Sequence, residues 1–386
     1  DFRQAVFRQE ETMGKHSVIT AGHICLDITP VFPGEKKVAR VDELLVPGKL
    51  VEMNAASVHT GGSVANTGLA LKLLGNDVTL LGKVGDDAFG AMLAEILSGY
   101  GAGGLIVDEG STTSYSVVLA LPGIDRMFLH HPGANNTFSA DDVPESALEN
   151  ASLFHFGYPP LMKKIYANDG EELKRIMQRA KEKGLVTSLD MAAIDANGDG
   201  GRVDWEKLLK NVLPFVDFFV PSFEELCFML NRPLFYRLTA SGEDCTDGLN
   251  VMQYAMPLAE KCLEMGCAVA MVKCGLSGLV WKCAGPKRME STGANWTADK
   301  AFWAGKYGHQ PCYQADTVRS STGAGDVTIA AWLTAALNGE TPEDCARLAA
   351  AEGAASVTSY DALGGLMTME QLKEKLRNGW KTHAGK

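Results

Sequence analysis

Several features that mark common protein classes are missing from this sequence. It has no run of eighteen apolar residues, so no transmembrane helix is expected. Its first twenty residues contain no continuous apolar core and therefore do not form a secretory signal. Positive charge is not in excess. The net charge is −11, which argues against nucleic acid or an anionic membrane as a partner.

Motifs for zinc, disulfides and two kinds of nucleotide binding are missing as well. The nine cysteines include no CxxC pair, and scattered thiols in a chain of this size predict a reducing, cytoplasmic location. No G-x-x-x-x-G-K-[ST] loop is present, which excludes a Walker-type NTPase. The GxGxxG match at 99–104 follows a predicted helix and precedes a predicted strand. Dinucleotide binding needs the reverse order, so a dinucleotide oxidoreductase has little support.

The composition and the order of predicted elements indicate a soluble α/β protein. Hydrophobic residues make up 46% and charged residues 22% of the 386 residues, which is enough for a sizeable core. In the second half of the chain, helices and strands alternate, and this alternation predicts a parallel sheet with helices on both faces. The predicted strands there are 151–157, 185–191, 216–222 and 268–275, and the predicted helices are 170–184, 203–213, 223–230, 256–266 and 323–339.

Two segments in the first half differ from this pattern. Residues 28–60 contain three prolines and β-prone stretches without a helical period. Residues 113–131 alternate like a β-hairpin that turns at Pro122 and Gly123. The two segments are far apart in sequence, but they can pair in space as a small sheet over one edge of the core.

The strongest motif is SSTGAGD at 320–326, which opens a long predicted helix. Glycines allow close backbone approach, and the unpaired amides of a helix start form an anion site. Asp326 lies in the first turn, where the helix dipole favours its ionised form, so it could accept a proton from an attacking hydroxyl. A helix start with a glycine loop and a stabilising aspartate explains these residues equally well.

A second motif, GGSVAN at 61–66, also opens a predicted helix. The double glycine would let a substrate touch the backbone, and Asn66 offers both a donor and an acceptor for hydroxyl groups. Taken alone, a tight turn followed by a helix cap is the better explanation.

Together the two stretches resemble the ribokinase/PfkB carbohydrate kinase family. GGSVANTGLALKLLG followed by GKVGDDAFG is similar to the first signature of that family, and SSTGAGD is similar to the second. The resemblance runs from about Val18 to Met369, and the two signatures have the order and separation of the family.

The resemblance implies a ribokinase-like α/β fold, with a Rossmann-like three-layer core and a small, discontinuous β-sheet lid. The core would comprise 17–27, 61–110 and 137–380, the lid 28–60 and 111–136, and residues 1–16 an N-terminal extension. The resemblance also implies ATP, Mg²⁺ and transfer of the γ-phosphoryl group to a hydroxyl of a sugar. Exposed lid edges predict a homodimer through the lid.

The resemblance assigns roles to individual residues. Asp326 would be the base, in an anion hole formed by Gly323, Ala324 and Gly325. The substrate-side residues would be Asp27, Gly61, Gly62, Asn66 and Gly157. The nucleotide-side residues would be Ser222, Glu225, Lys273, Gly275 and Gly278, with Glu225 in the water network around Mg²⁺.

Three positions depart from the family pattern. Ser222 replaces an asparagine, and Lys273 stands where threonine is common and could add a cation near the nucleotide. Ser320 replaces an aspartate that helps form a monovalent-cation site in many members, so K⁺ activation is doubtful here. The connection from 285 to 310 is longer than usual. It either folds over the nucleotide or forms a surface insertion or subunit contact.

A calcium-loop pattern occurs at 195–206. Asp195, Asn197, Asp199 and Glu206 fill the ligand positions of the D-x-[DN]-x-[DN]-G-x5-E pattern and predict a possible Ca²⁺ site. The flanking elements do not fit an EF-hand, because a predicted strand precedes the loop. An Asx-rich turn, with Asp204 capping the next helix, is the favoured alternative.

Two other functions remain open from the sequence. A nucleoside kinase of the same family would need an apolar, aromatic-lined pocket for a base, and a non-catalytic sugar-binding or regulatory protein could share the fold. The kinase assignment requires Asp326 to face an open cleft rather than to be packed under neighbouring side chains.

Overall fold

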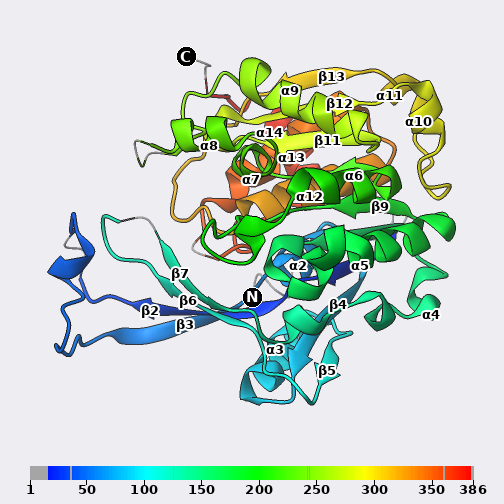
Figure 1. Ribbon diagram of the computed structural model, residues 1–386. Coiled ribbons are helices and arrows are strands. Elements are labelled where there is room, and N and C mark those ends of the chain that lie inside the picture. Colours follow the sequence, from blue (N-terminus) through cyan, green and yellow to red (C-terminus); the bar gives the residue numbers. More distant parts are fainter. Residues whose placement is uncertain are drawn as a thin grey trace.

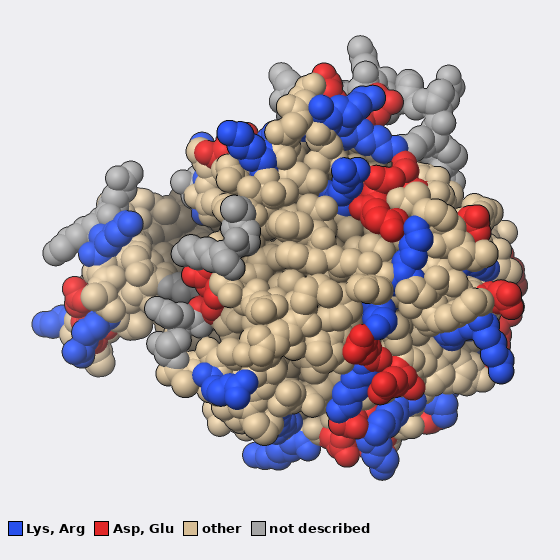
Figure 2. Space-filling view, turned by 90° about the horizontal axis from the view of Figure 1, so that it is seen from above, with Lys and Arg blue, Asp and Glu red and all other residues tan. Residues whose placement is uncertain are grey.

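The computed structural model describes residues 16–34, 37–124, 126–240, 242, 244–359 and 361–383. Of the N-terminal extension expected at 1–16, all but His16 lies outside the described residues. No helix in the described part of the chain is both long and apolar enough to cross a membrane. On the face shown in Figure 2, basic side chains lie among acidic ones and form no continuous basic patch.

A large twisted sheet forms the centre of the protein, with helices on both faces (Figure 1). Its strand order is β13-β12-β11-β10-β9-β8-β1-β4-β5. The strands are β1 (Ser17–Gly22), β4 (Asp77–Gly85), β5 (Ile106–Asp108), β8 (Leu153–Gly157), β9 (Val186–Leu189), β10 (Phe218–Phe219), β11 (Val269–Lys273), β12 (Leu279–Cys283) and β13 (Tyr307–Gln310). The expected parallel pairing is confirmed from β11 to β5, and two further strands, β12 and β13, add antiparallel to one edge.

The helices cover the sheet in two layers. They are α2 (Ser63–Leu73), α3 (Ala88–Gly99), α4 (Glu145–Leu148), α5 (Lys163–Glu182), α6 (Trp205–Val212), α7 (Phe223–Leu230), α8 (Arg232–Leu238), α9 (Val251–Glu264), α10 (Pro286–Glu290), α11 (Lys300–Trp303), α12 (Ala324–Leu337), α13 (Pro342–Ser356) and α14 (Met369–Arg377). Strand residues alternate between the two layers: in β11, Val269 and Met271 pack into the core with α12 and α13, and Ala270 and Val272 into the core with α5 and α9.

A separate four-stranded sheet projects from this core, to the left in Figure 1. Its order is β3-β2-β6-β7, formed by β2 (Cys25–Val31), β3 (Asn54–Gly61), β6 (Tyr115–Leu119) and β7 (Met127–His131). The predicted hairpin is present as the antiparallel pair β6 and β7, and β2 joins it to the first segment by pairing with β6. The two β-rich segments therefore pair in space as expected. We call this sheet the lid.

The chain crosses from core to lid earlier than the sequence indicated. Residues 17–27 were expected to belong to the core, but β1 ends at Gly22 and β2 begins at Cys25 in the lid. Gly22 has a φ of 121°, and a Cβ there would overlap the carbonyl oxygen of Gly157. The strand therefore breaks at a glycine packed on the neighbouring strand, and Asp27 belongs to the lid.

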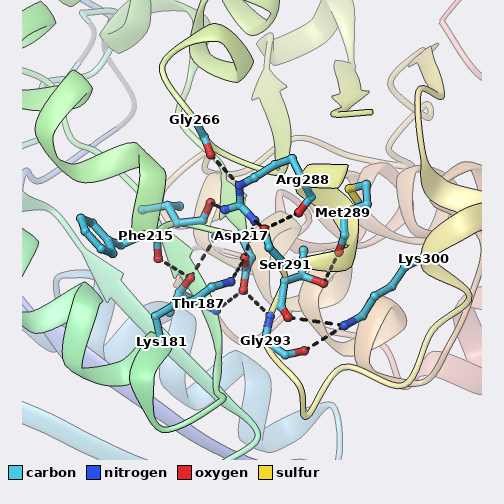
Figure 3. Close-up of polar contacts among 12 residues, drawn as sticks. Lys181, Thr187, Phe215, Asp217, Gly266, Arg288, Met289, Ser291, Gly293 and Lys300 are labelled. Atoms are coloured by element: carbon cyan, nitrogen blue, oxygen red, sulfur yellow. Dashed lines mark hydrogen bonds and ion pairs between the residues drawn. The ribbon is translucent and has the colours of Figure 1, made fainter. Parts of the chain in front are cut away.

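The first part of the long connection, residues 285–303, packs against the amino-terminal edge of the sheet (Figure 3), and the connection ends as strand β13. Asp217, which directly precedes β10, is fully buried and binds Lys181, the guanidinium of Arg288 (3.2 Å) and the amide of Gly293 (2.9 Å). Trp296, within this connection, is 2% exposed and packs edge-on against Phe218 of β10. Buried acid–base pairing and tryptophan packing hold residues 285–303 at the edge opposite the predicted motifs, so this part does not fold over the nucleotide. The end of β13 does lie beside Gly278, one of the nucleotide-side residues.

Candidate active site

Both predicted motifs lie at the carboxyl-terminal edge of the parallel strands, where ligands of open α/β sheets bind. β1 and β8 end side by side there, because Gly22 pairs with Gly157 in the sheet. The amide of His23 donates to the carbonyl of Gly157 at 3.2 Å, and the amide of Val64 at the start of α2 donates to His23 (3.1 Å). The start of α2 is thereby fixed to the ends of both strands.

The two signatures meet directly at Asp326. Gly323, with a φ of 75°, caps α12 and places Asp326 in the first turn. Its carboxylate accepts from Asn66 Nδ2 at 3.1 Å and from Thr67 Oγ1 at 2.9 Å, both on α2. The hydroxyl of Tyr158 lies 2.9 Å from one carboxylate oxygen and 2.8 Å from the other.

These contacts close the site around Asp326, which is only 3% exposed. Three side chains donate to this carboxylate, and the single proton of the Tyr158 phenol can go to either oxygen. The expectation that Asp326 faces an open cleft is therefore wrong for this structure. Asn66 and Thr67 hold the carboxylate from the helix side, and the phenol of Tyr158 covers it.

Sequence reasoning did not single out Tyr158, and its backbone conformation in the structure marks it as unusual. Tyr158 follows Gly157 and precedes two prolines, and its backbone is left-handed, with φ 63° and ψ 43°. Such a conformation costs a residue with a side chain about 1–2 kcal/mol and is concentrated at functional sites. Burial, and then the nearby charge of Asp326, raise the pKa of Tyr158 well above its usual value, so the phenol remains a donor.

The substrate-side residues lie next to this centre, at the junction of core and lid. Asp27 stands directly over Gly61, where a Cβ would overlap its carboxylate. Burial raises the pKa of Asp27, and Cys25 Sγ donates to it at 3.3 Å. Gly62 lies under the ring of His23, whose Nδ1 would be 2.6 Å from a Cβ at that position. Glycine is thus needed at both positions, because Asp27 packs on the backbone of Gly61 and His23 on that of Gly62.

Gly157 adjoins a buried polar network instead of offering a side chain. A Cβ at Gly157 would overlap Ser63. Ser63 Oγ lies 3.2 Å from His155 Nε2, and His155 Nδ1 lies 3.0 Å from Ser188 Oγ. Burial lowers the pKa of His155 to about 3, so this ring is neutral and structural. Glycine at 157 is therefore explained by packing.

Lys273 brings a cation to the anion-hole side of the site. Its Cε lies 3.5 Å from the position of a Cβ on Gly325. Its ammonium donates to Asp190 at 2.8 Å and to the carbonyl of Val220 at 2.7 Å. Burial raises the pKa of Asp190 to about 8, although the ammonium opposes that shift. Lys273 is the residue that the sequence analysis expected to add a cation near the nucleotide.

The other nucleotide-side residues shape the strand ends. Ser222 and Glu225 form a capping box at the start of α7, in which Glu225 accepts from the amide of Ser222 at 2.7 Å. Ser222 also bridges to the end of β11 at Lys273. Gly275 and Gly278, with φ values of 51° and 87°, form the tight loop that follows. The structure brings none of these loop glycines into contact with Asp326.

The lid also reaches the second signature. Arg126, just before β7, donates from its guanidinium to Ser321 Oγ at 2.8 Å. The hydroxyl of Ser320 remains within its own turn, where it accepts from the amide of Thr322 at 3.2 Å. Sequence reasoning did not single out Arg126, because a basic residue near a hairpin turn is ordinary on a protein surface.

The possible calcium site is not assembled. In the described part of the chain, no three His, Cys, Asp or Glu side chains gather closely enough to hold a metal ion. Asp195 accepts from the amide of Asn197 at 2.9 Å, as in an Asx turn, and Asp199 pairs with Lys163 at 2.9 Å. Glu206 pairs with two lysines. The turn is therefore the correct interpretation of 195–206.

Comparison with known proteins identifies related sequences and folds. The sequence pattern of the pfkB family carbohydrate kinases matches residues 34–368. Fructokinase-1 of Zea mays is 30% identical over 181 residues, which cover 46% of this chain and 51% of that protein. Fructokinase-1 of Oryza sativa subsp. japonica is 29% identical over 177 residues, 45% of this chain and 50% of that protein. The chain thus spans about half the length of the curated relatives it matches.

Solved structures match over nearly the whole chain. Arabidopsis thaliana ribokinase complexed with ribose and ATP has a TM-score of 0.68 and 19% identity, covering 94% of this chain and 99% of that one. A fructokinase with bound ATP from Xylella fastidiosa has a TM-score of 0.67 and 19% identity, covering 95% and 99%. At this identity the likeness concerns the fold alone, and it confirms the ribokinase-like architecture that the sequence predicts.

Proposed function

The chain belongs to the pfkB family of carbohydrate kinases, and we propose that it transfers the γ-phosphoryl group of ATP to a hydroxyl of a sugar or sugar-like substrate. The observation that carries this proposal is the hydrogen bond from Asn66 to Asp326, at 3.1 Å. It joins a residue suited to binding hydroxyls to a carboxylate in the first turn of a glycine-opened helix. A sugar hydroxyl and a phosphoryl group would therefore meet at one point.

In this proposal Asp326 is the base. As the sugar oxygen attacks phosphorus, its proton passes to the carboxylate, and the bond between the γ-phosphorus and the bridging oxygen of ADP breaks. The amides of Gly323, Ala324 and Gly325 would donate to the oxygens of the transferring group, where negative charge is concentrated; that of Ala324 now donates to the carbonyl of Ser321 at 3.3 Å. Positioning and charge stabilisation supply most of the rate in such reactions, and the base adds about 10²–10⁴-fold.

Magnesium and ATP fit the residues on the nucleotide side. Mg²⁺ usually keeps several waters and needs only one or two carboxylates besides substrate phosphates. The half-buried Glu225 supplies one carboxylate, and only one of its oxygens is used by the capping box. Mg²⁺ held there would shield the phosphate charge. The ammonium of Lys273, beside Gly325, would add a fixed positive charge. No charged side chain stands at Ser320, so the proposal includes no K⁺ requirement.

The lid would close over the sugar and exclude water. Asp27, over Gly61, would bind sugar hydroxyls from the lid side. The lid also exposes apolar side chains, because Phe128 and Leu129 are 56% and 58% exposed. Since these neighbours point to opposite faces of β7, both faces of the lid are uncovered there. We therefore include a homodimer through the lid in the proposal. The nine free thiols suit a cytoplasmic location.

The test is a screen of ADP release with fructose, ribose, ketodeoxygluconate, inositol and adenosine, with and without K⁺. We expect turnover with a sugar and its loss in Asp326→Asn, while calorimetry shows that ATP and sugar still bind. Asp316→Asn, which changes an exposed acid outside the site, is the matched control. Turnover retained by Asp326→Asn would refute the role of the base. Preference for adenosine would identify a nucleoside kinase instead.

One observation favours a second function. The carboxylate of Asp326 is buried and accepts hydrogen bonds from three neighbouring side chains, as in a protein that has kept the fold for binding alone. A non-catalytic sugar-binding protein would bind a sugar in the calorimeter and release no ADP with any substrate in the screen. ADP release by the unmodified protein would exclude that function.

A further inference from the structure

In this structure the phenol of Tyr158 occupies the position at Asp326 that a substrate hydroxyl would need for catalysis. A base must lie within about 2.6–3.2 Å of the proton that it accepts. The phenol of Tyr158 already lies at such distances from both oxygens of Asp326, and Asn66 and Thr67 donate to the same carboxylate. Asp326 is only 3% exposed, so we infer that an acceptor hydroxyl reaches the carboxylate by taking the place of the phenol. The phenol must then find another partner, because a buried unpaired hydroxyl is costly.

A partner is available at His23. This ring is 2% exposed, and neither ring nitrogen has a hydrogen-bond partner among the described residues. Its centroid lies 6.0 Å from that of Tyr158, and on the other side 5.2 Å from that of His130 in the lid. Burial, and then the neighbouring His130, lower the pKa of His23, so the neutral ring keeps one nitrogen as an acceptor. Unpaired buried groups of this kind are rare in native proteins.

The backbone around both residues permits side-chain rotation but little else. Tyr158 is held between Gly157 in the sheet and the buried Pro159 and Pro160. The backbone of His23 is held by Gly157 and by Val64. Exchange between partners must therefore occur by turning the phenol ring, with both backbones fixed.

We propose that Tyr158 is a two-position gate, whose phenol occupies Asp326 in the resting site and turns to His23 when a sugar hydroxyl takes its place. This inference rests on the proposed function. The exchange makes and breaks hydrogen bonds only: the phenol proton leaves the carboxylate and points to a ring nitrogen, and the sugar hydroxyl donates to Asp326. In the resting position the phenol keeps water from the base, so ATP is protected from hydrolysis while no sugar is bound.

The gate is tested with Tyr158→Phe, which keeps the ring and removes the hydroxyl. We expect the variant to hydrolyse ATP without sugar about tenfold faster than the unmodified protein, because water can then reach Asp326. We also expect a lower KM for the sugar, since no phenol competes for the carboxylate. The exposed Tyr307→Phe is the matched control. An unchanged rate of sugar-independent hydrolysis would overturn the gate.

His23→Phe removes the alternative partner. This change replaces an unpaired buried ring by an apolar one of similar shape, so we expect thermal unfolding at or above the original temperature. Sugar affinity, measured by calorimetry without ATP, should fall about tenfold, corresponding to the loss of one hydrogen bond to the displaced phenol. In kinetics, KM for the sugar should rise by a larger factor than kcat falls.

The double variant separates the gate from a structural role. If His23 acts through the phenol, His23→Phe should not weaken sugar binding in the Tyr158→Phe background. An equal loss in both backgrounds would overturn the proposal. The binding measurement needs no turnover. Loss of all ADP release in the substrate screen would refute the proposed function, whereas the binding cycle tests the gate by itself.

Discussion

Stability should depend on pH through one buried carboxyl group, Glu352 of α13. This side chain is fully buried and accepts from the amide of Met367 at 3.1 and 3.3 Å. Burial raises its pKa from 4.5 to about 8. Between these two values the folded protein holds a proton that the unfolded chain has released. The stability that this group contributes is therefore complete below pH 4.5 and is lost as pH rises through about 8.

The size of the effect follows from proton linkage. One proton bound only by the folded state changes the free energy of unfolding by about 1.4 kcal/mol per pH unit. The interval from about pH 5.5 to about 7.0 lies well inside the window, so the loss there is about 2 kcal/mol. Other groups titrate over the same range, and the contribution of Glu352 has to be isolated by difference.

The assay is urea unfolding of the unmodified protein and of Glu352→Gln across this interval. Glutamine cannot ionise but can still accept from Met367, so the variant should lose less stability with rising pH, by about 2 kcal/mol over the interval. Glu343→Gln, at an exposed position in the first turn of the same helix, is the control and should leave the slope unchanged. Parallel pH dependences of Glu352→Gln and the unmodified protein would refute the reasoning.

Three further outcomes are expected. Gly61→Ala should weaken sugar binding at least tenfold in calorimetry, because the added Cβ would overlap the carboxylate of Asp27. The control Gly99→Ala, whose added Cβ would meet open space, should bind the sugar normally. Equal binding by both variants would contradict the placement of the sugar. Lys273→Met should raise KM for ATP and lower kcat, because it removes the positive charge beside Gly325. The variant should stay folded, because Asp190, with its pKa of about 8, can remain protonated when its partner is lost. Unchanged kinetics would remove Lys273 from the nucleotide site. Leu129→Lys should dissociate the proposed dimer in light scattering, and an unchanged mass would argue against the lid interface.

Much of the architecture could be predicted because the determining signals are local. The start of α12 follows from glycines before an apolar run, and the hairpin of the lid follows from strict alternation around Pro122 and Gly123. Long-range packing decided the rest. The break between β1 and β2 depends on Gly22 meeting the backbone of Gly157, and nothing in the continuous apolar pattern marks it.

The candidate site shows the same division. Asp326 and Asn66 could be singled out because each opens a helix after glycines. Tyr158 and Arg126 could not, because their roles depend on which side chains fill the space over Asp326 once strand β8 and the lid are in place. The calcium prediction was wrong for a related reason. The carboxylates of Asp195, Asp199 and Glu206 bind a backbone amide or lysine side chains and do not converge on one point.

The cluster around Asp217 lies at the opposite end of the strands from Asp326. One buried carboxylate there ties together a strand start, α5 and the connection at 285–310. These contacts stabilise the amino-terminal ends of the strands, where no chemistry is proposed. The loops at the carboxyl-terminal ends, around Asp326, are not constrained by this cluster. The proposed motions of the lid and of Tyr158 would then leave the amino-terminal ends of the strands unchanged, because the contacts that stabilise those ends lie away from the parts that move.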